Sequence, residues 1–322
     1  MPATAFVFPG QGSQAVGMGR DLAAAFAAAR EVFQEVDETL RQKLSKLMFE
    51  GPAEELTLTA NAQPALMAVS LATLRVLEHE GGTALAQRAA VVAGHSLGEY
   101  SALAAAGSFP IATAARLLRR RGEAMQRAVP PGLGAMAALL GVELADAQDI
   151  CAAAAPVPDS DPPAREVVEP ANDNGAGQVV ISGHRSAVER AVAIAQARGI
   201  RRAMLLPVSA PFHCALMQPA AEAMAEALAE TPPLAPAIPL VANVSAAKAT
   251  DPAEIRDLLI RQCTATVRWR ESVATMSSLG VTRFVELGAG KVLTGLIRRI
   301  APDAATASAG TPAEIETLLK SF

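Results

Sequence analysis

The sequence AAVVAGHSLG, residues 89–98, is the most informative stretch of this chain. Its first five residues are apolar and predict a buried strand, and residues 97–106 predict a helix. The residues that join them, Gly94 to Gly98, match the pattern G-x-S-x-G with Ser96 at its centre. Glycines on both sides of the serine let the backbone turn sharply without steric clashes, which exposes the hydroxyl above a sheet. The segment therefore predicts an α/β protein with a nucleophilic serine.

A nucleophilic serine needs a base, and the chain contains four histidines, His79, His95, His184 and His213. His213 lies in a loop after a predicted strand and C-terminal to Ser96, which is the order and setting expected of a base. We expect His79 to face solvent beside glutamates, the His95 side chain to point away from the serine, and His184 to cap a helix. The residues alone leave another interpretation open, an ordinary Gly/Ser turn between strand and helix.

A glycine-rich loop, GQGSQA at residues 10–15, follows a short apolar strand at residues 5–8. It satisfies the dinucleotide-binding pattern G-x-G-x-x-A, but that fold requires a second strand ending in an acidic residue about 20 positions later. The chain shows helical spacing over residues 20–48 instead. Such a loop also presents backbone N–H groups to an anion. We therefore expect Gln11 and Leu97 to donate their N–H groups to the oxyanion of a reaction at the serine.

Composition excludes several classes of protein. Of the 322 residues, 51% are hydrophobic and 19% are charged, with a net charge of −4, so neither a basic nucleic-acid binder nor a disordered acidic tail is expected. The three cysteines, Cys151, Cys214 and Cys263, form no C-x-x-C pair, which argues against a disulfide framework or a cysteine zinc site. The first residues, MPATAFVFPG, lack the basic start of a signal peptide, and no uninterrupted apolar run of about 18 residues predicts a membrane span. We expect a cytoplasmic enzyme.

The pattern of predicted elements changes near Pro130-Pro131-Gly132, which indicates a second domain. The elements predicted there alternate as βαββαβ, with strand 134–142, helix 145–154, strands 166–170 and 178–183, helix 186–198 and strand 201–208. This order predicts an antiparallel sheet with two helices on one face. We place the small domain at residues 131–206, inserted into an α/β core of residues 1–130 and 207–322. Residues 156–165, rich in proline and aspartate, are expected to form a surface loop.

Six motifs stand in an order typical of one family. They are FPGQGSQ at residues 8–14, GHSLGEY at 94–100, RG at 121–122 with MQ at 125–126, QVVISG at 178–183, PFHCALM at 211–217 and ELGAGKVLTG at 286–295. Over essentially its whole length the chain resembles the malonyl-CoA:acyl-carrier-protein transacylases. The resemblance implies a hydrolase-like α/β core with a mainly parallel sheet and an inserted ferredoxin-like small domain, which is also what the pattern of elements predicts.

The resemblance also implies roles for individual residues. Ser96 would be the acylated nucleophile, His213 its base, and Arg121 the cation that pairs with the malonyl carboxylate. The main-chain carbonyl of Gln262 would orient the histidine in place of an acidic side chain. Phe212 lies just before the histidine. In related acyltransferases, a phenylalanine at this position is found in enzymes that use malonyl rather than α-methylated substrates. The remaining matches to the family's site are the oxyanion donors Gln11 and Leu97 and the polar residues Gln63, Asn172 and Asn174.

The implied function is transfer of the malonyl group from malonyl-CoA to the pantetheine thiol of acyl carrier protein, through a malonyl-serine intermediate, in fatty acid synthesis. No cofactor or metal would be needed, and we expect a monomer. The alternatives are a related acyltransferase of polyketide synthesis or malonate decarboxylation, a serine hydrolase or thioesterase, and a non-catalytic carrier-protein-binding module. The residues alone also allow the run Arg119 to Arg121 to be a solvated helix end.

Docking of an acidic carrier protein would require a local basic patch, because the chain as a whole is negatively charged. The candidates are Arg201, Arg202, Arg268, Arg270, Lys291, Arg298 and Arg299. An ordinary solvated charge is the alternative for each of them.

Overall fold

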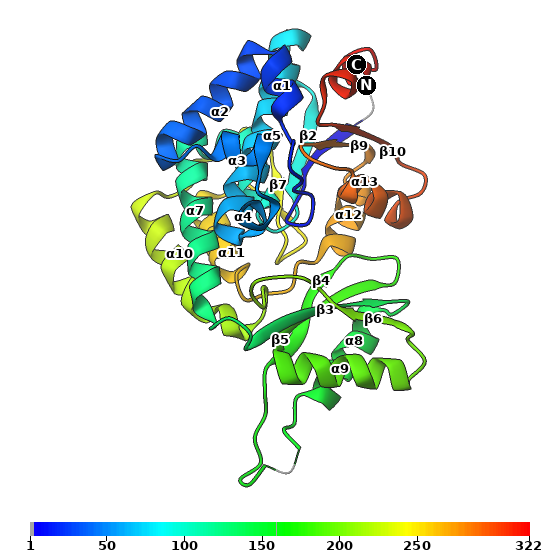
Figure 1. The fold of residues 1–322 in the computed structure, drawn as a ribbon. Helices are drawn as coiled ribbons and strands as arrows, with labels where there is room; N and C mark the ends of the chain where they lie inside the picture. Colours follow the sequence, from blue (N-terminus) through cyan, green and yellow to red (C-terminus); the bar gives the residue numbers. More distant parts are fainter. Residues whose placement is uncertain (1–2, 159) are drawn as a thin grey trace.

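Two sheets organise the molecule, which is described here from a computed structural model (Figure 1). The structure describes residues 3–158 and 160–322; Asp159 of the expected surface loop, and Met1 and Pro2, lie outside the described residues. The large sheet has six strands in the order β10-β9-β1-β2-β7-β8, and the small one has four in the order β4-β5-β3-β6. No helix in the described ranges is long and apolar enough to cross a membrane.

The large sheet is mainly parallel, which confirms the predicted fold class. Its strands are β1 (Ala3–Phe8), β2 (Ala89–Gly94), β7 (Leu240–Val241), β8 (Lys248–Ala249), β9 (Val281–Leu287) and β10 (Ala305–Ala309). Strand β1 pairs in parallel with β2 and β9, and β8 alone is antiparallel, at one edge. Because β1 is an inner strand that is buried on both faces, its residues 5–8 form a continuous apolar run and not an alternating one.

Helices cover both faces of the large sheet. Phe6 and Phe8 of β1 face one cluster, whereas Ala5 and Val7 face the other, as the alternation of side chains along a strand requires. The first face is covered by α1 (Arg20–Ala25), α2 (Ala27–Leu40), α3 (Leu44–Glu50), α4 (Ala53–Thr57), α5 (Thr59–Gly81), α6 (Gly98–Ala105), α7 (Ile111–Ala128), α10 (Gln218–Glu230), α11 (Pro252–Arg261) and α14 (Pro312–Leu319). The second is covered by α12 (Trp269–Ser278) and α13 (Val292–Ile300). Two short 3-10 turns also belong to this part of the molecule, at Leu85–Gln87 and Ala215–Met217.

The helical spacing over residues 20–48 belongs to three helices. The chain leaves α1 in extended conformation at Phe26, and α2 ends at Arg41, whose φ of 50° is left-handed. A left-handed residue stops the helical hydrogen-bond ladder, so apolar spacing alone does not mark these ends.

The small sheet has the predicted βαββαβ order. Its elements are β3 (Gly134–Leu140), α8 (Leu144–Ala154), β4 (Val168–Asp173), β5 (Gln178–His184), α9 (Arg185–Ala197) and β6 (Arg202–Leu205). All of its pairings are antiparallel, and α8 and α9 share one apolar cluster with it, which confirms the ferredoxin-like arrangement. These elements fall inside residues 131–206, the domain division that we predict from the sequence.

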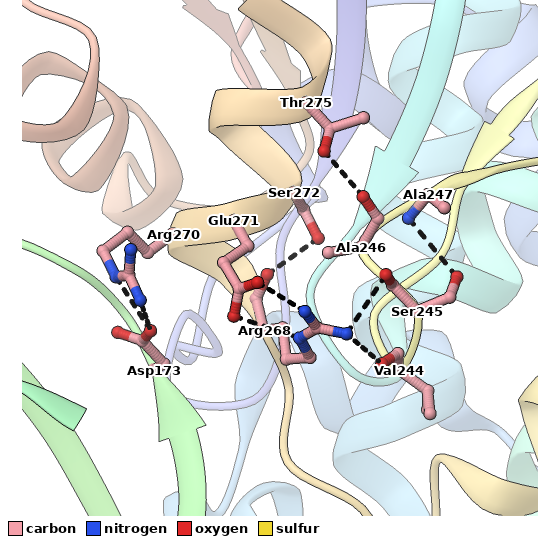
Figure 2. A network of polar contacts seen from close by, with 10 residues as sticks. All are labelled: Asp173, Val244, Ser245, Ala246, Ala247, Arg268, Arg270, Glu271, Ser272 and Thr275. Atoms are coloured by element: carbon pink, nitrogen blue, oxygen red, sulfur yellow. Dashed lines mark hydrogen bonds and ion pairs between the residues drawn. The ribbon is translucent and has the colours of Figure 1, made fainter. Parts of the chain in front are cut away.

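Strand β4 joins the small sheet to the segment that precedes α12. Val267 bridges the end of β4 in parallel, donating its N–H to Ala171 and accepting from Asp173, both at 2.9 Å. Arg270 forms an ion pair with the buried carboxylate of Asp173 at 2.9 Å, and Figure 2 shows the arginine reaching from α12 toward the small sheet. Backbone pairing and one ion pair therefore hold β4 against the large sheet's helices.

Candidate active site

The turn between β2 and α6 forces Ser96 into a strained conformation. Its φ of 52° lies in the left-handed region, which a non-glycine residue seldom adopts. Side chains at the flanking glycines are sterically impossible, because a Cβ at Gly94 would lie 1.9 Å from the carbonyl of Gly98, and a Cβ at Gly98 would lie 2.2 Å from the carbonyl oxygen of Phe8. The G-x-S-x-G pattern is thus a requirement of the backbone as well as of the chemistry.

Ser96 and His213 form a hydrogen-bonded pair, although they are far apart in the sequence. Ser96 Oγ lies 2.8 Å from His213 Nε2, and His213 Nδ1 lies 2.8 Å from the carbonyl oxygen of Gln262. A carbonyl oxygen can only accept, so Nδ1 carries the proton and Nε2 can take one from the serine. Burial, and then the positive charge of Arg121, lower the pKa of His213 from 6.5 to about 3. The imidazole is therefore a neutral base at physiological pH.

Arg121 is a buried cation beside the serine. It projects from α7, is 1% exposed, and donates to Ser96 Oγ at 3.1 Å, to Gln262 Oε1 at 2.9 Å and to Gln63 Oε1 at 2.8 Å. Within the described part of the chain no carboxylate lies within ion-pair distance of it. A buried guanidinium with only neutral partners is suited to bind an anionic group of a substrate. Of the three consecutive arginines, Arg120 is the one paired at the surface, with Glu226 and Glu230.

Two further residues, Glu99 and Asn243, support the serine and the histidine, and neither was predicted from the sequence. Asn243 Oδ1 accepts the N–H of Ser96 at 2.8 Å, and its Nδ2 donates to the carbonyl of Gly94 at 2.7 Å. The carboxylate of Glu99 accepts from Asn243 N at 2.8 Å and from Gln262 Nε2 at 3.0 Å. The signal in the sequence was one acid among small and apolar residues in a predicted helix, and the structure buries all of residues 98–103.

Burial raises the pKa of Glu99 from 4.5 to about 7, against the lowering effects of its two hydrogen-bond donors and of Arg121. Its second carboxylate oxygen, Oε1, has no hydrogen-bond partner within the described residues. A carboxyl group with such a pKa changes its charge within the physiological pH range.

A cavity of about 530 Å³ opens above Ser96. It is lined by residues of both sheets and of the glycine-rich loop, and the predicted site residues on its wall are Gln11, Gln63, Leu97, Arg121, Asn172, Asn174, Phe212 and His213. Gln262 does not line it and is fully buried behind the histidine. The structure therefore gathers every predicted site residue in and directly behind one cavity.

The walls of the cavity are connected by hydrogen bonds. Gln63 donates to Thr59 at 2.9 Å and Thr59 donates to the Gln11 side chain at 3.0 Å, which links the glycine-rich loop to the residue that holds Arg121. His95 turns to the opposite wall, where its Nε2 lies 2.9 Å from Asn174 Oδ1. The backbone N–H groups of Gln11 and Leu97 make no hydrogen bond to any described residue, so both are available to an oxyanion.

Three of the predicted docking cations are ion-paired: Arg268 with Glu271, Arg270 with Asp173, and Lys291 with Glu314. They add little net positive charge to the surface, which weakens the predicted basic patch. Residues 3–158 and 160–322 contain no group of three or more His, Cys, Asp or Glu side chains placed to hold a metal ion, and the three cysteines are buried and free.

Comparison with known proteins agrees with this geometry. The acyl transferase domain family matches residues 5–313. The malonyl CoA-acyl carrier protein transacylase of Escherichia coli K12 is 49% identical over 309 residues, which are 96% of each chain, and that of Bacillus subtilis 168 is 45% identical over all 322 residues and 98% of its own length. The chain belongs to the malonyl-CoA:acyl-carrier-protein transacylase family. The family predicted from the six motifs, and the enzyme class that goes with it, are confirmed.

Solved structures of this family have the same fold. The acyl-carrier-protein S-malonyltransferase of Bartonella henselae is 54% identical and superimposes with a TM-score of 0.93 over 99% of both chains. A second transacylase, solved in complex with a type II polyketide acyl carrier protein, is 42% identical with a TM-score of 0.93, over 99% of this chain and 100% of that one.

Proposed function

We propose that this transacylase transfers the malonyl group of malonyl-CoA to the pantetheine thiol of acyl carrier protein through a malonyl ester on Ser96. His213 Nε2 takes the serine proton as Oγ attacks the thioester carbon, and the same proton passes to the sulfur of CoA when the C–S bond breaks. The carrier protein's thiol then gives its proton to His213 and attacks the ester, and the serine is restored. The 2.8 Å contact between Ser96 and His213 supports this cycle.

Arg121 is the residue that would make the enzyme selective for a malonyl group. In a malonyl thioester the carboxylate is two bonds from the carbonyl carbon, and the guanidinium lies 3.1 Å from the attacking oxygen. The cation is therefore at the right range for a three-carbon acyl chain with a terminal carboxylate. On binding, that carboxylate would take over donors that now serve Ser96 and Gln262, and a planar guanidinium can hold both of its oxygens.

The other cavity residues complete the proposed site. The N–H groups of Gln11 and Leu97 would hold the oxyanion, and each such donor is worth about 2.7–4 kcal/mol of barrier. Phe212 packs beside the base and would crowd a methyl branch at the α-carbon. Gln63 holds Arg121 in place, while Asn172 and Asn174 offer polar groups to the substrate from the small sheet.

The proposed partner is a carrier protein that bears phosphopantetheine. The solved complex between a family member and a type II polyketide carrier protein supports this partner class. We assign the chain to the fatty-acid carrier because its curated relatives are malonyl CoA-acyl carrier protein transacylases. Malonyl-enzyme offered to a fatty-acid and a polyketide carrier protein side by side should lose its malonyl group faster to the first; faster loss to the second would overturn this assignment.

Intact-protein mass spectrometry tests the acyl-enzyme directly. Brief mixing with malonyl-CoA should give one malonyl adduct on the wild type, a much weaker adduct with acetyl-CoA, and none on Ser96→Ala. Adding carrier protein should remove the adduct. Absence of any adduct without release of malonate would contradict the proposal, and accumulation of free malonate without an adduct would identify a hydrolase.

A further inference from the structure

Glu99 is a buried acid directly beneath the reacting groups. It is fully buried in the first turn of α6, three residues after Ser96. It touches neither the cavity nor His213, so it has no part in the proton transfers described above. Burying a carboxylate is costly, and a fold keeps one where its charge is used.

One oxygen atom of Glu99 holds both halves of the catalytic pair. Its Oε2 accepts from the backbone N–H of Asn243 and from the side-chain amide of Gln262. The Asn243 side chain in turn bonds both the N–H of Ser96 and the carbonyl of Gly94, at the centre and the start of the strained turn. The Gln262 carbonyl orients His213. The hydrogen bonds that position Ser96 and those that position His213 therefore meet at the same oxygen atom of Glu99.

The segments that meet at Glu99 are also fixed from the opposite side. Arg268 donates its backbone N–H to the carbonyl of Asn243 and its guanidinium to the carbonyls of Val244 and Ser245, and Figure 2 shows it reaching from the start of α12 into that turn. The backbone of Asn243 is thus bonded on one side to Arg268 and on the other to Glu99, and from this position its side chain accepts the N–H of Ser96.

The geometry points to Glu99 as a positioning residue whose negative charge aligns Ser96 with His213 and tightens the contact of Arg121 with the site. This role rests on the proposed function of the same site. The Gln262 amide donates to Glu99 and accepts from Arg121, so a negative charge on Glu99 polarises the amide and makes its oxygen a better acceptor. Arg121 of α7 is the cation that acts on Glu99, and the other titratable groups of this cluster are Tyr100 of its own helix and Cys263 after α11.

The variant Glu99→Gln removes the charge and keeps the shape and one acceptor oxygen. The readout is the rate at which a neutral fluorophosphonate labels Ser96, because this reaction needs the serine and histidine but no acyl substrate. At about pH 8.5 the variant should label about tenfold more slowly than the wild type, since charge-assisted hydrogen bonds are replaced by neutral ones. Near pH 5.5 the two rates should converge, because Glu99 of the wild type is then protonated; His213 does not titrate in this window.

Glu286→Gln is the matched control, since Glu286 is also a buried glutamate that accepts from backbone N–H groups, at the start of α13. It should keep the wild-type pH profile. A Glu99→Gln profile identical to the wild type, or one lowered equally at every pH together with the melting temperature, would overturn the inference. Malonylation measured in parallel should show a lower kcat and a KM changed by less than about twofold. If labelling follows the expected pattern while malonyl-CoA gives no adduct, the proposed function fails and the role of Glu99 stands.

Discussion

Nδ1 of His213 lies 2.8 Å from the main-chain carbonyl oxygen of Gln262, so a peptide group occupies the place that a carboxylate takes in a Ser-His-Asp triad. The carbonyl supplies the correct tautomer without adding a negative charge beside the base. That fits the proposed pairing of Arg121, whose positive charge acts on the same histidine, with an anionic substrate.

This arrangement separates the effects of two substitutions. His213→Ala removes the base and should slow acylation of Ser96 by about 10²- to 10⁴-fold. Gln262→Ala keeps the peptide carbonyl and removes the side-chain contacts to Arg121, to Glu99, to the carbonyl of Ser96 and to Asn243, so its loss should be about tenfold. Rapid-quench measurement of acylation by malonyl-CoA compares the two. Equal losses would mean that the Gln262 side chain, and not its carbonyl, orients the base.

Arg121 variants should change selectivity more than stability. Arg121→Ala should lower the preference for malonyl-CoA over acetyl-CoA by about 10- to 100-fold, since a charge-assisted hydrogen bond is worth about 1.5–3 kcal/mol. Arg121→Lys keeps the charge but loses the two-pronged contact, so it should recover only part of that preference. Competition between the two thioesters, read by mass spectrometry, gives the ratio. Arg120→Ala, on the same helix but paired at the surface, is the control and should keep the wild-type ratio.

Stability should depend on pH through Glu99. Its pKa in the folded protein is about 7, above the usual 4.5, so the folded state holds a proton that the unfolded state releases. The stability that this proton contributes is present below pH 4.5 and is lost as the pH rises to 7, a change of about 3 kcal/mol. Glu99→Gln cannot lose a proton, so its free energy of unfolding should rise relative to the wild type between about pH 5 and pH 8. Urea unfolding at both pH values measures this, and parallel behaviour of the two proteins would refute it.

The ion pair between Arg270 and Asp173 should stabilise the junction of the two sheets. Asp173 has a side chain that is 2% exposed, so Arg270→Ala leaves a buried carboxylate without its cation and should cost about 1–3 kcal/mol of unfolding free energy. The double variant with Asp173→Asn should recover part of this loss. Arg261→Ala breaks an exposed pair with Asp257 and should cost less than about 0.5 kcal/mol. Urea unfolding that shows equal effects for the two arginines would contradict a special role of the junction.

Local sequence was a good guide to elements whose signal is local. The elbow around Ser96 was predictable because only glycines fit at Gly94 and Gly98. The order of the six elements of the small sheet was predictable because strands such as β5 and helices such as α9 have apolar spacing bounded by turn residues, although β4 begins two residues later than the sequence predicts. The breaks at Phe26 and Arg41 were not, since the helical spacing of apolar residues continues across them.

The fold class and the family could be read from the sequence alone, and Ser96 is predicted from it as the nucleophile, because each of these depends on residue types in a fixed local order. Which groups lie together depends on the packing of distant segments. Ser96, Arg121, His213 and Gln262 come from four separate segments, and contacts of 2.8–3.1 Å join them in the order Ser96–His213–Gln262–Arg121–Ser96. The place of Glu99 beneath them likewise follows from packing, since nothing in its neighbours along the chain indicates that Asn243 and Gln262 will close around it. Contacts between distant segments are determined by how the helices pack on the sheet, so a local sequence pattern does not predict them.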